Sequence, residues 1–206
     1  MGLKNEFWAA ARATSGYEFW QQIKVMKTVD DGKPTDWLLV IPLQQWARHA
    51  FNDDAKCDDI TNNMTESFNS WVGKLRGMPI IRIVDCIRQK CMVRLHKRFA
   101  KSCTWEGNLT LMAKQKLRQL RKESTNCSLL PGNNDEFEVQ DGKPRYAVKL
   151  REKKCSCQGW PVAGLPCKHA ALCIGYKRGN IEEYCSEFFN VKTYLAAYNG
   201  VIHPLP

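Results

Sequence analysis

The sequence predicts an α+β protein in which a helical N-terminal two-thirds precedes a small β-rich module. Up to about residue 122, apolar residues recur at the three- and four-residue spacing of amphipathic helices. Beyond residue 134 the period changes, and residues 137–139 and 146–150 alternate between apolar and polar as strands do. Asp141 and Gly142 suit the turn between these two strands. A compact set of cysteines and a histidine follows directly.

Local signals place the individual helices. Ser15 and Glu18 have the spacing of a capping box and predict a helix of about ten residues. Thr35 is expected to cap a short helix, and Pro42 to start another. Longer helices are expected over residues 62–76, from residue 80 to about 95, and over 109–122. Pro131 and its neighbours make residues 126–134 a predicted linker.

The helix over residues 62–76 has two predicted faces. Met64, Phe68, Trp71 and Leu75 recur at helical spacing and are expected to form a buried stripe. Asn62, Glu66, Asn69 and Gly73 would form a polar face opposite this stripe. From chemistry alone, one carboxylate among amides is a solvated or capping face.

Composition excludes some classes of protein. No apolar run approaches the roughly 18 residues that a membrane span needs, and the first residues do not have the pattern of a signal peptide. We therefore expect a soluble intracellular protein without a membrane partner. Its ten cysteines are then expected to be mostly reduced, so regular spacing among them favours metal binding over disulfides.

Positive charge is concentrated in one segment. The chain carries a formal net charge of +10, and residues 74–122 hold 14 basic residues against two acidic ones. Such a run favours binding to a polyanion, DNA above all; the alternative is a solvated helical face. The candidate nucleic-acid-binding residues are Lys74, Arg76, Arg82, Arg88, Lys90, Arg94, Lys97, Arg98, Lys101, Lys114, Lys116, Arg118, Arg121 and Lys122.

The strongest chemical signal is a four-residue cluster near the C-terminus. The cluster consists of Cys155 and Cys157, followed after nine residues by Cys167 and His169. Together they supply three thiolates and one imidazole. That set matches a closed tetrahedral zinc site, which builds structure and leaves no open position for catalysis. The alternative is unrelated core cysteines with a surface histidine. Cys173 could compete as a ligand, although its apolar neighbours favour core packing.

The spacing C-x-C-x9-C-x-H after a β-hairpin resembles the SWIM-type zinc finger. The fuller string over residues 155–169, CSCQGWPVAGLPCKH, resembles the version in plant Mutator-like transposases. Within the aromatic tail over 181–206, residues 188–198 and 201–206 are similar to the segment that follows the finger there. The resemblance implies a ββα finger over residues 135–180, preceded by a basic helix and linker over 105–134.

The N-terminal region resembles the same family. T-N-x-x-x-E at residues 61 to 66, with Trp46 upstream and Ser67-Phe-Asn69 downstream, is similar to the last catalytic block of the Mutator-type transposase domain. Residues 1–104 then correspond to the C-terminal portion of a domain with a ribonuclease-H-like fold. That domain holds two divalent metals, Mg²⁺ or Mn²⁺, with two aspartates and one glutamate, and Glu66 matches the glutamate.

The family's two aspartates have no match in this chain. They lie before the point at which this sequence begins, and the local acidic residues do not match them; these are Asp53, Asp54, Asp58 and Asp59. Glu66 is therefore expected to be a catalytic relic. Mg²⁺ or Mn²⁺ is expected only if another chain completes the site.

Three functions follow as hypotheses. The first is a zinc-containing, transposase-derived DNA-binding protein in the nucleus, inactive alone. The second is an active transposase that completes its site with another chain. The third is a protein-interaction or transcription-regulatory module, since plant regulators of the far-red-impaired-response type carry the same finger. Self-association is expected if aromatic residues such as Trp20 and Trp37 lack their original covering.

Overall fold

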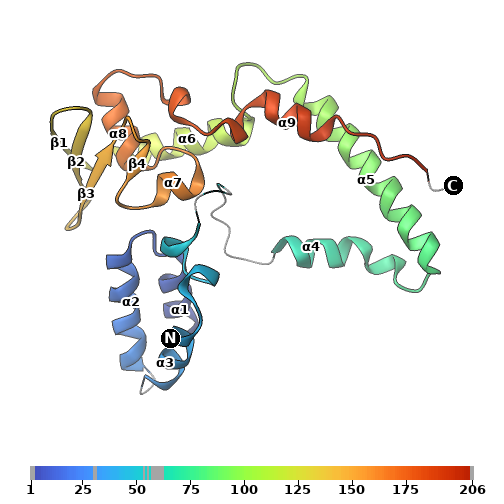
Figure 1. The fold of residues 1–206 in the computed structure, drawn as a ribbon, viewed down its shortest axis with the longest axis horizontal. Helices are drawn as coiled ribbons and strands as arrows, with labels where there is room; N and C mark the ends of the chain where they lie inside the picture. Colours follow the sequence, from blue (N-terminus) through green and yellow to red (C-terminus); the bar gives the residue numbers. More distant parts are fainter. Residues whose placement is uncertain (1–2, 30–31, 53, 55, 57–62, 205–206) are drawn as a thin grey trace. The chain divides into compact units, whose positions relative to one another are not determined.

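The computed structural model describes residues 3–29, 32–52, 54, 56 and 63–204. The chain divides into two compact units, one of residues 1–60 with 114–186 and one of residues 61–113 with 187–206. Helices and one small antiparallel sheet make up the described residues, which confirms the predicted α+β class (Figure 1). None of the described helices is both long and apolar enough to span a bilayer.

The first unit begins with a helical cluster, by which we mean residues 3–52. It contains α1 (Leu3–Arg12), α2 (Gly16–Val29), α3 (Lys33–Val40) and the short helices η1 (Leu43–Gln45) and η2 (Arg48–Ala50). The core of the cluster is made by Ala10, Ala13, Phe19, Ile23, Met26 and Ala47. Trp46 packs on Phe19 with their ring centres 5.5 Å apart, whereas the side chain of Trp37 remains 69% exposed.

The start of α2 follows from its capping residues. The backbone N–H of Glu18 donates to Ser15 Oγ at 3.2 Å, and the Glu18 carboxylate accepts from the backbone N–H of Thr14 at 3.2 Å. The predicted start is thus correct, and the helix continues for 14 residues instead of ten. Thr35 is not the cap of α3: Gly32 takes that position with a φ of 77°, and Thr35 is buried inside the helix.

The sheet of the first unit is a four-stranded antiparallel meander in the order β1-β2-β3-β4. Its strands are β1 (Ser128–Pro131), β2 (Glu136–Gln140), β3 (Arg145–Lys149) and β4 (Lys154–Cys155). Phe137 pairs with Val148 and Val139 with Tyr146, so that these four side chains are buried on one face. The alternation of residues 137–150 therefore correctly predicted the central hairpin.

Four further helices accompany the sheet in sequence. They are α6 (Leu111–Ser124), which precedes it, and α7 (Gly159–Ala163), α8 (Lys168–Tyr176) and η4 (Ile181–Tyr184), which follow it. Contacts between α8 and β3 place the start of α8 beside the sheet.

The predicted linker over residues 126–134 contains an edge strand. Residues 128–131 form β1, in which Leu129 pairs with Val139 of β2 and is half-buried. A strand at the edge of a sheet needs hydrogen bonds along one side only and tolerates a proline such as Pro131. The sequence did not predict this short strand, because residues 131–134 at the end of the segment are typical of turns.

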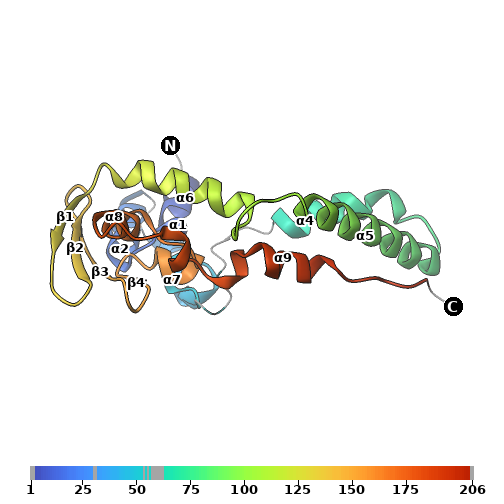
Figure 2. The same ribbon diagram turned by 90° about the horizontal axis from the view of Figure 1, so that it is seen from above.

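The second unit is built from helices. It contains α4 (Asn63–Val72), η3 (Gly73–Leu75), α5 (Ile80–Ser102), η5 (Glu187–Phe189) and α9 (Val191–Tyr198). Helix α9 lies along α5 (Figures 1 and 2). Tyr194 of α9 packs on Trp105 at a ring separation of 4.9 Å, and the Arg98 guanidinium lies 5.1 Å from the centre of the Tyr198 ring. These contacts join the C-terminal segment to the end of α5.

The predicted buried stripe of α4 is largely exposed. Leu75 is buried, but Met64 and Phe68 are 78% and 48% exposed. Ile80 at the start of α5 is 71% exposed as well. Helical periodicity indicates which face is apolar, but burial also needs a partner. The described elements of this unit provide no layer that covers this face.

We expect Phe19→Ala to destabilise the helical cluster by about 3–5 kcal/mol, because Phe19 is fully buried and its loss leaves a cavity. Amide hydrogen exchange in α2 measures this free energy of opening. Trp37→Ala is the control, and its exposed ring should change the same free energy by less than about 0.5 kcal/mol. Equal effects of the two variants would contradict the assigned core.

Candidate metal centre

Three short segments bring the four predicted ligands together. Cys155 ends β4, and Cys157 lies in the turn that follows. The chain then passes through α7 and returns, so that Cys167 is the N-cap residue of α8 and His169 lies in its first turn. All four side chains are buried, and their ligand atoms lie within 4.8 Å of one another.

The distances within the cluster suit a tetrahedral zinc ion. His169 Nδ1 lies 3.6 Å from Cys155 Sγ and 3.9 Å from Cys167 Sγ. Zinc bonds of about 2.3 Å to sulfur and about 2.0 Å to nitrogen would place tetrahedral ligand atoms roughly 3.5–3.8 Å apart. Three thiolates and one imidazole are also a donor set that structural zinc prefers. The residues therefore fit this metal in both geometry and chemistry.

The return of the chain depends on the left-handed backbone of Gly164. Its φ is +70°, and its carbonyl accepts a hydrogen bond from the Ser186 N–H at 2.8 Å. A Cβ at this position would lie 3.0 Å from the Cβ of Lys56. Glycine is therefore the residue that satisfies both the conformation and the space. Trp160, 2% exposed, fills the interior of the loop.

The second nitrogen of His169 has its own partner. His169 Nε2 lies 3.3 Å from Asp141 Oδ2, and the same carboxylate forms an ion pair with Lys168. Partial burial opposes ionisation of Asp141, but hydrogen bonds from Lys168 and His169 lower its pKa below the ordinary value. The ionised carboxylate can hold the proton on Nε2 and leave Nδ1 free for the metal, the arrangement typical of zinc-binding histidines.

Tyr146 supports the histidine ring from one side. The two rings stack at 4.2 Å with an interplanar angle of 19°. The Tyr146 hydroxyl donates to Glu18 Oε1 at 3.0 Å. Burial first, and then the negative charge of Glu18, raise the Tyr146 pKa, so the phenol stays protonated as a donor.

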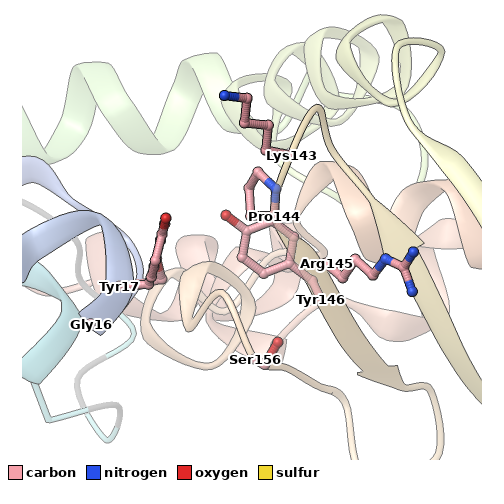
Figure 3. Close-up of a pocket in the computed structure, with 8 residues that line it drawn as sticks. Gly16, Tyr17, Lys143, Pro144, Arg145, Tyr146 and Ser156 are labelled. Carbon is pink, nitrogen blue, oxygen red and sulfur yellow. The ribbon is translucent and has the colours of Figure 1, made fainter. Parts of the chain in front are cut away.

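Beside this ring the first unit has a cavity of about 510 Å³ (Figure 3). Tyr17 and Tyr146 face each other across it, whereas the Arg145 side chain points away and forms an ion pair with Glu138.

The three thiols influence one another's ionisation. Hydrogen bonds from Cys155 and Cys167 lower the pKa of Cys157 well below its usual range. The same contacts raise the pKa of Cys155 and of Cys167. Zinc binds thiolates, so metal binding must displace the protons that remain on the three cysteines.

Two further cysteines lie close to the ligand set in sequence or in space. Cys173 is fully buried and belongs to neither group of potential metal ligands among the described residues. Burial raises the pKa of its thiol to about 12, which favours a role in the core.

Cys127 lies within 4.8 Å of Asp141 and His169, on the side of Nε2. His169 Nδ1 faces the sulfur ligands, so the ring cannot at the same time bind that metal through Nε2. We therefore do not count Cys127 among the ligands.

Among the residues that the structure describes, the predicted catalytic residue belongs to no cluster of potential metal ligands. Glu66 is exposed on α4, and no group of three potential metal ligands among the described residues includes it. Asp54 is described and likewise belongs to no such group, whereas Asp53, Asp58 and Asp59 lie outside the described residues.

The predicted basic residues are divided between the two units. Nine of them lie in residues 74–101 of the second unit, and five lie on α6 in the first. All are exposed except three that are half-buried, namely Arg88, Lys90 and Lys114. Arg88 forms an ion pair with Asp85 at 2.8 Å.

Sequence analysis missed Asp141, Tyr146 and Cys127 as neighbours of the site. The sequence indicates Asp141 only as a turn residue and Tyr146 only as a strand residue. No local spacing relates them to His169, which lies 28 residues after Asp141. Only the packing of the hairpin against the start of α8 brings them together.

The family model described as SWIM zinc finger matches residues 137–172. The match begins in β2, ends in α8 and contains all four ligand residues. No curated protein and no solved structure matches the chain. The family match and the buried cluster together support structural zinc at this site.

Cys157→Ala should abolish stoichiometric zinc binding and unfold the finger, because binding and folding form one equilibrium in small metal modules. Cys173→Ala is the matched control, since it removes an equally buried thiol that is not a ligand. We expect the control to retain one zinc per chain. Elemental analysis and protease resistance of residues 135–180, with and without a chelator, provide the measurements. Zinc loss in the control alone would contradict the assignment.

Asp141→Asn should weaken zinc affinity by about tenfold or more, because the charge that orients His169 is removed. Competition with a chelator of known affinity measures the change. Asp135→Asn is the control: this carboxylate pairs with Arg151 and Lys177 and touches no ligand residue. Equal affinity of the Asp141 variant and the wild type would show that Asp141 does not orient the ligand.

Proposed function

We propose that this chain is a zinc-stabilised DNA-binding protein derived from a Mutator-like transposase and that it acts in the nucleus. The observation that carries the proposal is the excess of exposed cations between residues 74 and 122, with only two acidic residues among them. Each phosphate that a cation neutralises releases counterions from nucleic acid, which gives binding without any base contact.

The basic residues of the finger and those of helix α6 differ in whether they have carboxylate partners. On the finger, basic side chains are matched by carboxylates: Arg145 pairs with Glu138, and Lys149 with Glu136 and Glu152. On α6, the exposed cations are Lys116, Arg118, Arg121 and Lys122, and no ion pair is described for them. These cations therefore remain available for phosphates, while the closed ligand set gives the metal a structural role.

The proposed descent explains Glu66 without requiring catalysis. The T-N-x-x-x-E block at residues 61 to 66 resembles the last catalytic block of the transposase domain with a ribonuclease-H-like fold. Two-metal phosphoryl transfer needs several carboxylates that converge on ions about 3.5–4 Å apart. The described residues supply no such group at Glu66. Catalysis with Mg²⁺ or Mn²⁺ would therefore need carboxylates from elsewhere.

Protein interaction is the second candidate function. It is favoured by the exposed apolar side chains of α4 and α5, among them Met64, Ile80 and Ile81. Patches of this kind mark interfaces with other proteins or with a second copy of the chain. This function predicts weak DNA binding that does not depend on the basic residues.

Titration of the zinc-loaded chain with duplex DNA across a salt series tests the proposal. We expect the affinity to fall steeply with salt, with a slope of about −0.9 in log K against log salt for each phosphate contacted. Changing Lys116, Arg118, Arg121 and Lys122 to glutamine should reduce the slope by up to about four such units.

The control variant removes two cations that already have carboxylate partners. Lys27 pairs with Asp36 and Lys149 with Glu136, so the double change of Lys27 and Lys149 to glutamine should leave the slope unchanged. Absent or salt-independent binding would refute the DNA-binding proposal. DNA cleavage that requires Mg²⁺ or Mn²⁺ and disappears in Glu66→Gln would instead support the active transposase.

A further inference from the structure

The second unit contains a groove of about 460 Å³ in which a tryptophan lies among cations. Trp71 at the end of α4 forms one wall. Lys90, Arg94, Lys97 and Arg98 of α5 supply the charge, and Gln89 and Val93 complete the lining. From Lys90 to Arg98 the helix rises roughly 12 Å, so the four cations form a short row along one side of α5.

Trp71 is held in the groove by two of these cations. Lys90 Nζ donates to the Trp71 carbonyl at 2.9 Å and lies 5.2 Å from the centre of the indole ring. The Arg94 guanidinium lies 5.4 Å from the same centre. Contacts of this kind order both the ring and the cations before any ligand binds.

The charge of the groove is not neutralised from within. None of the seven side chains that line it is acidic. The carboxylate of Asp85, which lies near in sequence, already accepts from Arg88 at 2.8 Å and from Gln89 at 2.7 Å. For the four lining cations, no ion pair to a described carboxylate is found. A groove with this charge favours a ligand with several negative charges.

We propose that this groove binds unpaired nucleotides, with a base stacked on Trp71 and phosphates along Lys90, Arg94, Lys97 and Arg98. A positive groove with an aromatic side chain in it is the arrangement by which proteins bind single strands without reading sequence. In a duplex the faces of the bases are covered by their neighbours, and only an unpaired base can expose a face to the indole. The inference rests on the proposed nucleic-acid function and names the site and the form of nucleic acid within it.

Binding of a 12-nucleotide oligothymidine to the full zinc-loaded chain tests the groove. We expect Trp71→Ala to weaken this binding roughly 5- to 150-fold, the range found for loss of one stacked base. Binding of a 12-base-pair duplex to the same variant should change less than about threefold. Trp105→Ala is the matched control, because Trp105 belongs to the same unit, packs on Tyr194 and does not line the groove. It should leave oligothymidine affinity unchanged.

A second variant retains Trp71 and keeps the test valid if Trp71→Ala fails to fold. Changing the exposed Arg94 and Lys97 to glutamine should lower the salt slope for oligothymidine by about 1.4, or about 0.7 for each lost phosphate contact. The same change at Lys27 and Lys149, which pair with Asp36 and Glu136 and lie outside the groove, should leave that slope unaltered.

The outcomes separate this inference from the wider proposal. If Trp71→Ala weakens duplex and oligothymidine binding equally, or if the two pairs of charge variants behave alike, the groove is not a single-strand site. Salt-dependent duplex binding would then still support the proposed function. If duplex binding is absent and oligothymidine binding depends on Trp71 as described, the groove stands and the duplex proposal fails.

Discussion

The finger depends on the convergence of three sulfur atoms and one ring nitrogen. The matched segment, residues 137–172, is shorter than the roughly 40 residues below which chains rarely fold on an apolar core alone. The apolar side chains that it buries include Val139, Val148 and Trp160. A metal bound by Cys155, Cys157, Cys167 and His169 would join the end of the sheet to the start of α8. The remaining contacts of the finger are consistent with this junction.

His169 connects the centre to a wider set of polar contacts. One ring nitrogen faces the sulfurs, the other faces Asp141, and the ring stacks on Tyr146, whose hydroxyl donates to Glu18. Glu18 in turn accepts from the backbone of Thr14 at the start of α2. These contacts connect one ligand to two residues of the hairpin and to the N-terminal cap of a helix far away in the sequence.

The candidate zinc site and the basic residues without carboxylate partners lie in different elements of the described structure. Carboxylates accompany the basic side chains of the finger, as in the pairs Arg145–Glu138 and Arg151–Asp135. On α5 and α6 the cations outnumber their described carboxylate partners, and on α5 some of them surround an indole ring. This division agrees with a finger that maintains structure and helices that contact a polyanion.

Features that depend on neighbours along the chain could be predicted from the amino-acid sequence. The ligand spacing, the alternation of residues 137–150 and the start of α2 were all predictable, because turns, strands and caps follow from local backbone geometry. Three features could be seen only in the folded protein: Asp141 lies beside His169, residues 128–131 form an edge strand, and Met64 stays exposed. These features depend on which distant surfaces meet, and hydrophobic periodicity identifies an apolar face without identifying its partner.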